Sequence, residues 1–372
     1  VILQQGSIPA RKEILREERS ADMINWILLS NSMLASFLTG TANRIFIIAL
    51  PTLAHFLGTD LLGISLALIA YQLSFTSFAI VFGRLGDLFG RLKVFGIGLL
   101  VFTISSLLCG LAQNIFQLVS FRLLQGLGAA MSQSQGRALA MDSTSGSAAG
   151  KGQGFMTTAY HSGFLFGPSI GGLLIDYLHW RAIFFFLVPI GTVGAMMTWM
   201  NMKRSPVSAG PTAPGKRPSI DYLGAVLLVV VTLSLITVLD RIVIELVGPG
   251  LRGVAVALFV ISFLVFLLRE SFASSPLLDL SLFKIRMFAF SASCLLVVSI
   301  NHSMSSFLLP FYLQEILHLS PSFIGLLFMS APVFTVTLSP VGGYIADKWG
   351  PRVPSTTGVV LFGTAALIGT LL

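Results

Sequence analysis

The chain has 372 residues, of which 55% are hydrophobic and only 10% are charged, and its formal net charge is +8 at pH 7. This composition excludes a soluble globular domain and is typical of a protein that crosses a lipid bilayer many times. Most basic residues lie in short connections between apolar runs rather than on one basic face, which argues against a nucleic-acid partner. Cys109 and Cys294 stand alone inside apolar runs. We therefore expect no disulfide framework, no metal site and no cofactor.

The long apolar runs predict an all-α polytopic membrane protein, because helices satisfy their own backbone hydrogen bonds in lipid. A polar segment, residues 1–22, precedes the first run and shows no cleavable signal peptide. We expect eleven helices, over residues 24–50, 62–82, 94–112, 116–136, 155–176, 183–202, 222–240, 253–269, 287–311, 322–343 and 353–372.

A polar connection divides this series of helices. Residues 203–221 are rich in Pro, Gly, Ser and basic residues, a composition that cannot bury a core and that predicts a flexible cytoplasmic linker. The linker follows a predicted six-helix bundle over residues 23–202. Two further helices are expected over residues 222–270, and the first three helices of a second bundle over residues 271–372.

The distribution of charge predicts the orientation. Seventeen of the 23 Lys and Arg residues fall in the N-terminal segment or in connections on its side of the bilayer, whereas three, Arg181, Arg241 and Arg252, fall on the other side. Basic residues concentrate on the cytoplasmic side of membrane proteins. We therefore expect a multi-pass protein of the plasma membrane with a cytoplasmic N-terminus.

The stretch GRLGDLFGRLK, residues 83–93, places charge and glycine between two apolar runs. Gly83, Gly86 and Gly90 permit a tight reversal. Asp87 can accept hydrogen bonds from a facing helix N-terminus and can pair with Arg91. Such a loop could latch two bundles together in one state and release them in another, whereas a plain capped turn would explain the charges alone.

The pattern Gly-x3-Asp-x2-Gly recurs 260 residues later as Gly343, Asp347 and Gly350, followed by Arg352. The recurrence indicates two halves built on one plan and favours the switch over the plain turn. If the second half copies the first, three helices are missing after Leu372. Because the first residue is Val rather than Met, we expect a truncated chain, with a naturally short product as the alternative.

GRLGDLFGRLK resembles the cytoplasmic loop signature of the major facilitator superfamily, Gly-x-Leu-(Ala/Gly)-Asp-x-x-Gly-Arg-(Arg/Lys)-x, with Leu92 where Arg or Lys is usual. RLLQGLG, residues 122–128, resembles the helix-4 motif of the family. WRAIFFFLVPIG, residues 180–191, and PLLDLSLFKIRMF, residues 276–288, resemble its fourteen-helix drug:proton antiporter branch. The resemblance implies two pseudo-symmetric six-helix bundles, an extra central helix pair, and proton-coupled export of hydrophobic or cationic molecules by alternating access.

Two predicted sites lie on the fourth predicted helix, over residues 116–136, and just after its end. An unpaired Arg122 at mid-membrane would cost about 2.5–3.5 kcal/mol, so it is expected to face a cavity and find a partner, with Gln125 one turn away. The resemblance implies a role for Arg122 in proton coupling; the alternative is an arginine that snorkels to the surface. It also implies a charge relay of Asp87, Arg91 and Asp142, unless Asp142 is an ordinary solvated acid.

The helix-5 stretch carries glycines at four-residue spacing, which leave one face open to close approach by another helix. Such a face often serves packing alone. The resemblance implies more, because the antiporter motif of helix 5 resists leakage between the two halves and favours exchange. The residues that fit this motif are Gly154, Gly163, Gly167, Pro168 and Gly171.

The acid usual in helix 1 of the fourteen-helix branch is replaced here by Ala42, and Arg44 adds a cation. Arg44 could attract an anionic substrate, pair with an acid on the missing helices, or snorkel. His161 and His302 could carry a proton in place of the acid, since histidine titrates near neutral pH. A neutral, hydrogen-bonded histidine at a helix contact is the alternative for both.

No G-x-x-x-x-G-K-[ST] signature occurs, so an ion gradient is the expected energy source. A membrane enzyme would need clustered catalytic groups, and the five scattered histidines argue against one. We predict a monomeric, non-enzymatic secondary transporter whose partners are a small-molecule substrate, protons and lipid. The alternatives are a differently coupled or proton-independent transporter of another, even anionic, metabolite, and a truncated non-transporting product.

Overall fold

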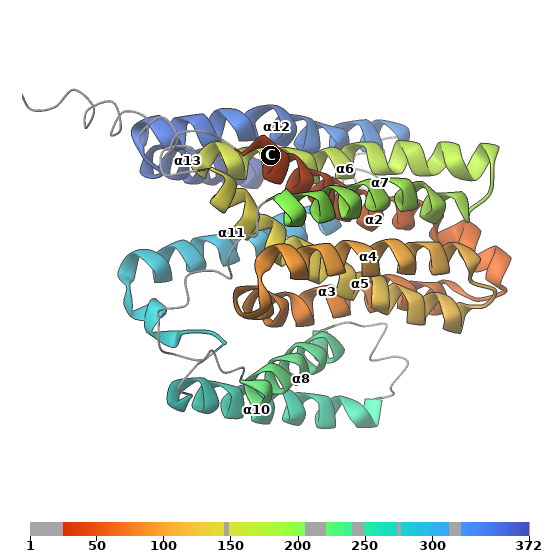
Figure 1. The fold of residues 1–372 in the computed structure, drawn as a ribbon, viewed down its shortest axis with the longest axis horizontal. Helices are drawn as coiled ribbons and strands as arrows, with labels where there is room; N and C mark the ends of the chain where they lie inside the picture. The colour runs from red at the N-terminus through yellow and green to blue at the C-terminus, as the bar shows by residue number, and fades with distance from the viewer. Residues whose placement is uncertain are drawn as a thin grey trace, which may run out of the picture.

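The structure is a computed structural model that describes residues 25–144, 149–204, 221–239, 249–273, 277–311 and 321–371. These residues form eleven α-helices and one short 3-10 helix, with no β-strand among them (Figure 1). The all-α fold predicted from the sequence is confirmed. Residues 1–22 and most of the predicted linker lie outside the described residues. The elements are α2 (Trp26–Leu57), α3 (Leu61–Phe89), α4 (Arg91–Leu111), α5 (Ile115–Ser143), α6 (Ala149–Tyr177), α7 (Ala182–Arg204), α8 (Tyr222–Leu239), α10 (Pro249–Phe272), η2 (Leu280–Lys284), α11 (Arg286–Phe311), α12 (Pro321–Trp349) and α13 (Arg352–Leu371).

Short polar side chains begin several of these helices. Asp60 Oδ1 accepts a hydrogen bond from Gly63 N at 2.8 Å, and Asn114 Oδ1 accepts one from Gln117 N at 2.9 Å. These contacts satisfy amides that have no partner in the first helical turn. At η2, the Asp279 side chain accepts a hydrogen bond from Ser281 N. Hydrogen bonds from the Ser281 hydroxyl and amide hold the pKa of Asp279 below its ordinary value.

Several helices are longer than the sequence predicts, α2 and α3 among them. α2 continues past Pro51 to Leu57, although its predicted end is residue 50, and α3 reaches Phe89 rather than residue 82. Membrane helices tolerate proline and glycine when neighbouring helices support them. α2 packs along α6, and α3 packs along α5. As a result, most of GRLGDLFGRLK is helical, which corrects the predicted loop.

The helices α2 to α7 pack on one another as one bundle: α2 against α6, α3 and α4 against α5, and α4 against α7. Aromatic side chains fill its interior, and the rings of Phe46 and Phe184 have centroids 6.0 Å apart. Phe95 and Phe102 are buried in a second cluster. Within a bilayer, close packing of this kind, rather than transfer of apolar surface from water, holds helices together.

The later helices attach to this bundle in two places. α8 packs against α10 and contacts α3, and the pair lies at one side of the molecule (Figure 1). α12 runs beside α6 and contacts α13. The pairing of α6 with α12 therefore joins the first bundle to the second part of the chain.

Several outer helix faces are apolar, as a bilayer requires. Within the described part of the chain, four helical segments are both long and apolar enough to span a membrane: Gly63–Phe89, Arg91–Leu111, Ala182–Lys203 and Gly253–Phe272. Large apolar side chains remain exposed on them, among them Leu100 on α4 and Ile261 on α10. These faces are suited to contact lipid rather than water.

Candidate functional site

The first glycine-rich motif lies at the end of α3, and only its last glycine turns the chain. Gly83, Gly86 and Asp87 are helical, whereas Gly90 has φ 99° and separates α3 from α4. A Cβ at Gly86 would collide with the side chain of Gln135 on α5. Glycine at position 86 therefore leaves room for the Gln135 amide, and backbone conformation favours glycine at position 90.

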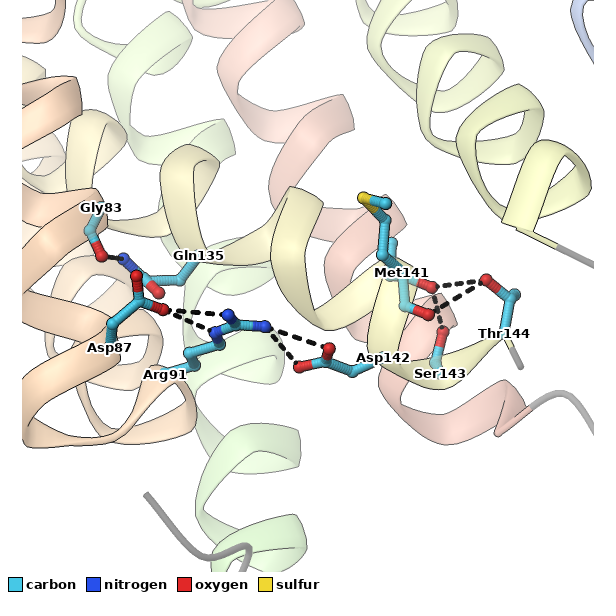
Figure 2. Close-up of polar contacts among 9 residues, drawn as sticks. Gly83, Asp87, Arg91, Gln135, Met141, Asp142, Ser143 and Thr144 are labelled. Atoms are coloured by element: carbon cyan, nitrogen blue, oxygen red, sulfur yellow. Dashed lines mark hydrogen bonds and ion pairs between the residues drawn. The ribbon is translucent and has the colours of Figure 1, made fainter. Parts of the chain in front are cut away.

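Three charged residues meet beside this turn (Figure 2). Arg91 Nε donates to Asp87 Oδ1 at 2.9 Å, and Arg91 Nη1 donates to Asp142 Oδ1 at 3.0 Å and to Oδ2 at 2.9 Å. The side chain of Asp142 is 50% exposed. Arg91 thus links the end of α3 to the end of α5. The structure brings together the three residues named for the charge relay.

Gln135 adds a neutral contact to the same corner. Its Nε2 donates to Phe82 O at 2.5 Å and to Gly83 O at 3.4 Å, the second bond being drawn in Figure 2, and its side chain lies against Gly86. The side chain is buried, so the bond matters more than an exposed one would. Sequence reasoning missed Gln135, because nothing in the sequence shows which α5 residue faces Gly86.

The second motif makes a different contact. Asp347, near the end of α12, accepts hydrogen bonds from the backbone amides of Gly150 at 2.7 Å and Lys151 at 3.0 Å. Both amides belong to the first turn of α6, where the helix dipole favours an anion. Asp347 therefore joins the second half of the chain to the first bundle.

This geometry corrects one prediction. The sequence assigned contact with a facing helix N-terminus to Asp87, but in this structure Asp347 makes that contact and Asp87 pairs within its own bundle. Gly350, with φ 84°, ends α12 as Gly90 ends α3. Arg352 is exposed at the start of α13, and no described carboxylate lies within ion-pair distance of it. We call the end of the molecule that holds Asp87, Arg91, Asp142 and Asp347 the charged end.

The glycines of α6 serve two different neighbours. A Cβ on Gly163 would lie 2.5 Å from Phe37 O of α2, and one on Gly167 would lie 3.3 Å from Thr41 O. Gly171 also faces α2, near Ile45. In contrast, a Cβ on Gly154 would lie 2.7 Å from Ser339 O of α12. The expected bare face therefore exists, but most of it packs within the first bundle, and only its charged end meets the second half.

Other residues strengthen the contact of α6 with α12. Gly150 and Gly343 approach each other so closely that a Cβ on either would collide with the backbone of the other helix. About two turns further along α6, Thr158 Oγ1 donates to Val336 O at 3.2 Å. Pro168 lies within α6, which remains helical on both sides of it. Sequence reasoning missed Gly150 as a functional candidate. Its four-residue spacing from Gly154 is the signal that could have identified it.

Arg122 is completely buried inside the first bundle. Its Nη1 donates to Gln125 Oε1 at 2.7 Å, its Nε donates to Ala67 O at 3.3 Å, and its guanidinium lies 4.1 Å from the Phe46 ring centroid and 4.4 Å from that of Tyr71. Arg122 Nη2 and the Tyr71 hydroxyl have no hydrogen-bond partner among the described residues. Arg122 therefore does not snorkel, and its partners are neutral groups rather than a carboxylate.

Gln125 connects Arg122 to a third helix. Its Nε2 donates to Ser106 Oγ at 2.7 Å, and Ser106 Oγ donates to Phe102 O at 2.7 Å on α4. This chain of bonds fixes the orientation of the Gln125 amide, so that its oxygen faces Arg122. Ser106 was missed by sequence reasoning because serine is common in membrane helices.

Arg44 lies between α2 and α6, with its guanidinium 4.4 Å from the Phe164 ring centroid. Within the described chain, no carboxylate lies within ion-pair distance of Arg44. His161 contacts the rings of Tyr160 and Phe164, both on its own helix α6, at centroid distances of 5.5 and 5.7 Å. His302 belongs to α11, but its side chain lies outside the described residues.

Sequence comparison bears directly on this arrangement. The sequence profile of the Major Facilitator Superfamily matches residues 32–300 and 291–372. The chain belongs to the major facilitator superfamily. It is therefore an integral membrane transporter, and the resemblance of its sequence to this superfamily is confirmed.

Individual major facilitator proteins resemble the chain over most of its length. The riboflavin transporter RibZ of Clostridioides difficile is 28% identical over 347 residues, which cover 93% of this chain and 73% of that protein. A protein of Escherichia fergusonii named "Putative multidrug resistance protein MdtD" is 29% identical over 355 residues, covering 92% and 72%. The proton:xylose symporter XylE matches in fold, with a TM-score of 0.52 and 13% identity over 87% of this chain and 69% of that one.

The glycines of this major facilitator transporter give a direct test of its packing. We expect Gly163→Ala to lower the free energy of unfolding by about 1–3 kcal/mol, because the added methyl overlaps the backbone of α2. The control is Gly172→Ala on the same helix, where a Cβ would meet nothing within 4 Å and alanine is the better helix former. Thermal unfolding in detergent would measure both variants. Equal destabilisation by the two would contradict the assigned α2 contact.

Proposed function

We propose that this protein is a secondary active transporter of the plasma membrane that exports small molecules in exchange for protons by alternating access. The observation that carries the proposal is the pair of bonds from Gly150 N and Lys151 N to Asp347, which join the two halves at the charged end. Breaking a few such contacts would allow the halves to part there. This contact resembles a latch that a transport cycle makes and breaks.

The two motifs have different roles in this proposal. Asp347 is the latch between halves, whereas Arg91 braces the ends of α3 and α5 through Asp87 and Asp142. The brace keeps the first bundle rigid while it rocks. Exposed ion pairs contribute only about 0–1 kcal/mol each, so the brace positions helices rather than stabilising the whole fold.

The charged end is cytoplasmic in this proposal, as is the N-terminus. The basic residues of the first bundle's connections gather at this end, and such residues concentrate on the cytoplasmic side. The state with Asp347 bound to α6 is then closed toward the cytoplasm. The protein acts as a monomer, because each chain holds its own latch.

Arg122 is the proposed residue for proton coupling. Its charge is buried among neutral partners, so a substrate anion or a nearby carboxylate would change its surroundings strongly. The Arg122 Nη2 group, which has no hydrogen-bond partner among the described residues, is placed to donate a hydrogen bond to such an anion or carboxylate. Arg122 is therefore a positioning residue for whichever group carries the proton.

The substrate is proposed to be a hydrophobic or cationic molecule with a flat ring system, in keeping with the riboflavin and multidrug names of its relatives. An anionic substrate is the second candidate, and a specific arrangement favours it. On α6, Gly154 and Thr158 face α12, while Gly163 and Gly167 face α2. Tyr160 and Phe164, about one turn apart on α6, lie on the side of the helix that packs against Gly40 of α2.

Two arginines lie beside the rings of Tyr160 and Phe164. Arg44 rests on Phe164, and both Arg44 and the exposed Arg137 of α5 are close enough to Tyr160 for their charges to act on its hydroxyl. Two cations beside aromatic rings could bind an aromatic carboxylate.

Proteoliposomes with an internal pH-sensitive dye test the function. We expect an outward gradient of an organic cation such as ethidium to drive proton movement, with empty liposomes as the control. Salicylate and riboflavin are tested in parallel as an anion and a neutral ring system. Flux of salicylate that Arg44→Gln and Arg137→Gln both reduce would favour the anionic substrate. Substrate flux without proton movement would contradict proton coupling, and no flux of any probe would contradict transport.

A further inference from the structure

A groove on the outer face of α4 and α7 has no part in the site described above. The two helices approach closely at small residues, since a Cβ on Gly96 would lie 3.0 Å from Thr198 Cγ2. Beside this contact they leave a cavity of about 1010 Å³. Its apolar lining comes from Ile97, Leu100 and Ile104 of α4 and from Met196 and Met200 of α7. All five side chains are exposed on the outer surface of the bundle.

The groove has a cationic end. Lys93 lies in the first turn of α4 and Lys203 in the last turn of α7, and both line the cavity at the charged end of the molecule. The N-terminus of α4 and the C-terminus of α7 lie together here, so their dipoles oppose each other and the two lysines supply the charge. Lys203 Nζ lies 4.9 Å from the ring centroid of Trp199. Among the described residues that line the groove, none is acidic.

The dimensions suit one lipid in one leaflet. From Lys93 to Ile104 the groove follows α4 for about 16 Å, at ~1.5 Å per residue. That length is about half of the ~30 Å hydrocarbon core of a bilayer. Tryptophan favours the interface between hydrocarbon and head groups, and Trp199 lies between the lysines and the apolar part. The lysines, the Trp199 ring and the apolar channel therefore follow one another in the same order as the phosphate, the interfacial region and the acyl chains of a phospholipid.

We propose that this groove binds an anionic phospholipid, with its phosphate between Lys93 and Lys203 and an acyl chain along Leu100 and Met196. Two cations with no acid among the described lining residues attract an anionic head group more strongly than a zwitterionic one. Charge therefore selects the occupant. The leaflet follows from the orientation proposed above. The binding itself does not depend on whether the protein exchanges protons.

Native mass spectrometry of the purified chain, with equal amounts of phosphatidylglycerol and phosphatidylcholine of the same acyl chains, tests this site. We expect the wild type to retain more phosphatidylglycerol. Lys93→Gln and Lys203→Gln should each lower the retention ratio by about fivefold, and the double variant by about thirtyfold. Leu100→Trp, which fills the groove, should lower retention of both lipids and leave their ratio unchanged.

Lys348→Gln is the matched control. Lys348 also lies near the charged end, with its Nζ 5.6 Å from the Trp349 ring centroid, but it does not line the groove. We expect it to leave the ratio as in the wild type. A ratio unaffected by the double variant, or lowered equally by Lys348→Gln, would overturn the proposal. Size-exclusion profiles of all variants would show that each remains folded.

Discussion

Replacing Arg122 with methionine is expected to reduce transport by about 100-fold, the effect typical of a misplaced reacting group, while the fold survives. Methionine fills similar space without charge. Removal of the charge relieves a cost of about 2.5–3.5 kcal/mol at mid-membrane. Against this, the variant loses two ring contacts worth about 0.5–2 kcal/mol each and the hydrogen bond to Gln125. These opposing contributions leave a small net change in the free energy of unfolding.

The measurement pairs flux in proteoliposomes with thermal unfolding in detergent. Arg181→Met is the matched control, because Arg181 also lies over a ring, at 4.5 Å from the Trp180 centroid, and donates to Ala112 O at 3.1 Å. Arg181 lies at the opposite end of the bundle, so its loss should change transport by no more than about twofold. Unchanged transport in Arg122→Met would show that Arg122 is only a structural residue.

Replacing Asp347 with asparagine is expected to part α6 and α12 at the charged end. Asparagine keeps one oxygen acceptor but loses the charge that strengthens the bonds from Gly150 N and Lys151 N. A loss of about 1–2 kcal/mol would raise the ratio of open to closed molecules by about 5–30-fold. Asp347→Asn should therefore populate a state closed on the opposite side.

Spin labels at Gln153 of α6 and Val341 of α12, both exposed, would report this separation as a distance distribution. The background needs Cys294→Ser, since Cys294 is exposed and Cys109 is buried. Asp87→Asn is the control, because Asp87 pairs with Arg91 inside one bundle. If Asp87→Asn lengthens the distance and Asp347→Asn does not, the latch is assigned to the wrong motif.

Much of the fold follows from the sequence because a bilayer leaves few choices. Long apolar runs must become helices in lipid, so all-α architecture and the approximate helix positions could be predicted. Helix ends were less predictable: Pro51 and Gly86 both lie within helices, because packing against α6 and α5 supports them. Packing against neighbouring helices therefore overrides local sequence signals for a helix break.

The sequence by itself singled out the candidate functional residues. The repeated Gly-x3-Asp-x2-Gly pattern identified Asp87 and Asp347, and an arginine within an apolar run identified Arg122. These signals are local, since charge and glycine are costly in membrane helices and stand out from their surroundings.

Only the tertiary structure decided which partners these residues have. It placed Asp347, rather than Asp87, on the N-terminus of α6, and gave Arg122 neutral partners from two neighbouring helices and from its own. It also brought Lys93 and Lys203, more than a hundred residues apart, to one groove. The physical reason is that contacts between helices depend on which faces pack together, and the period of 3.6 residues does not specify the neighbour of an almost wholly apolar helix.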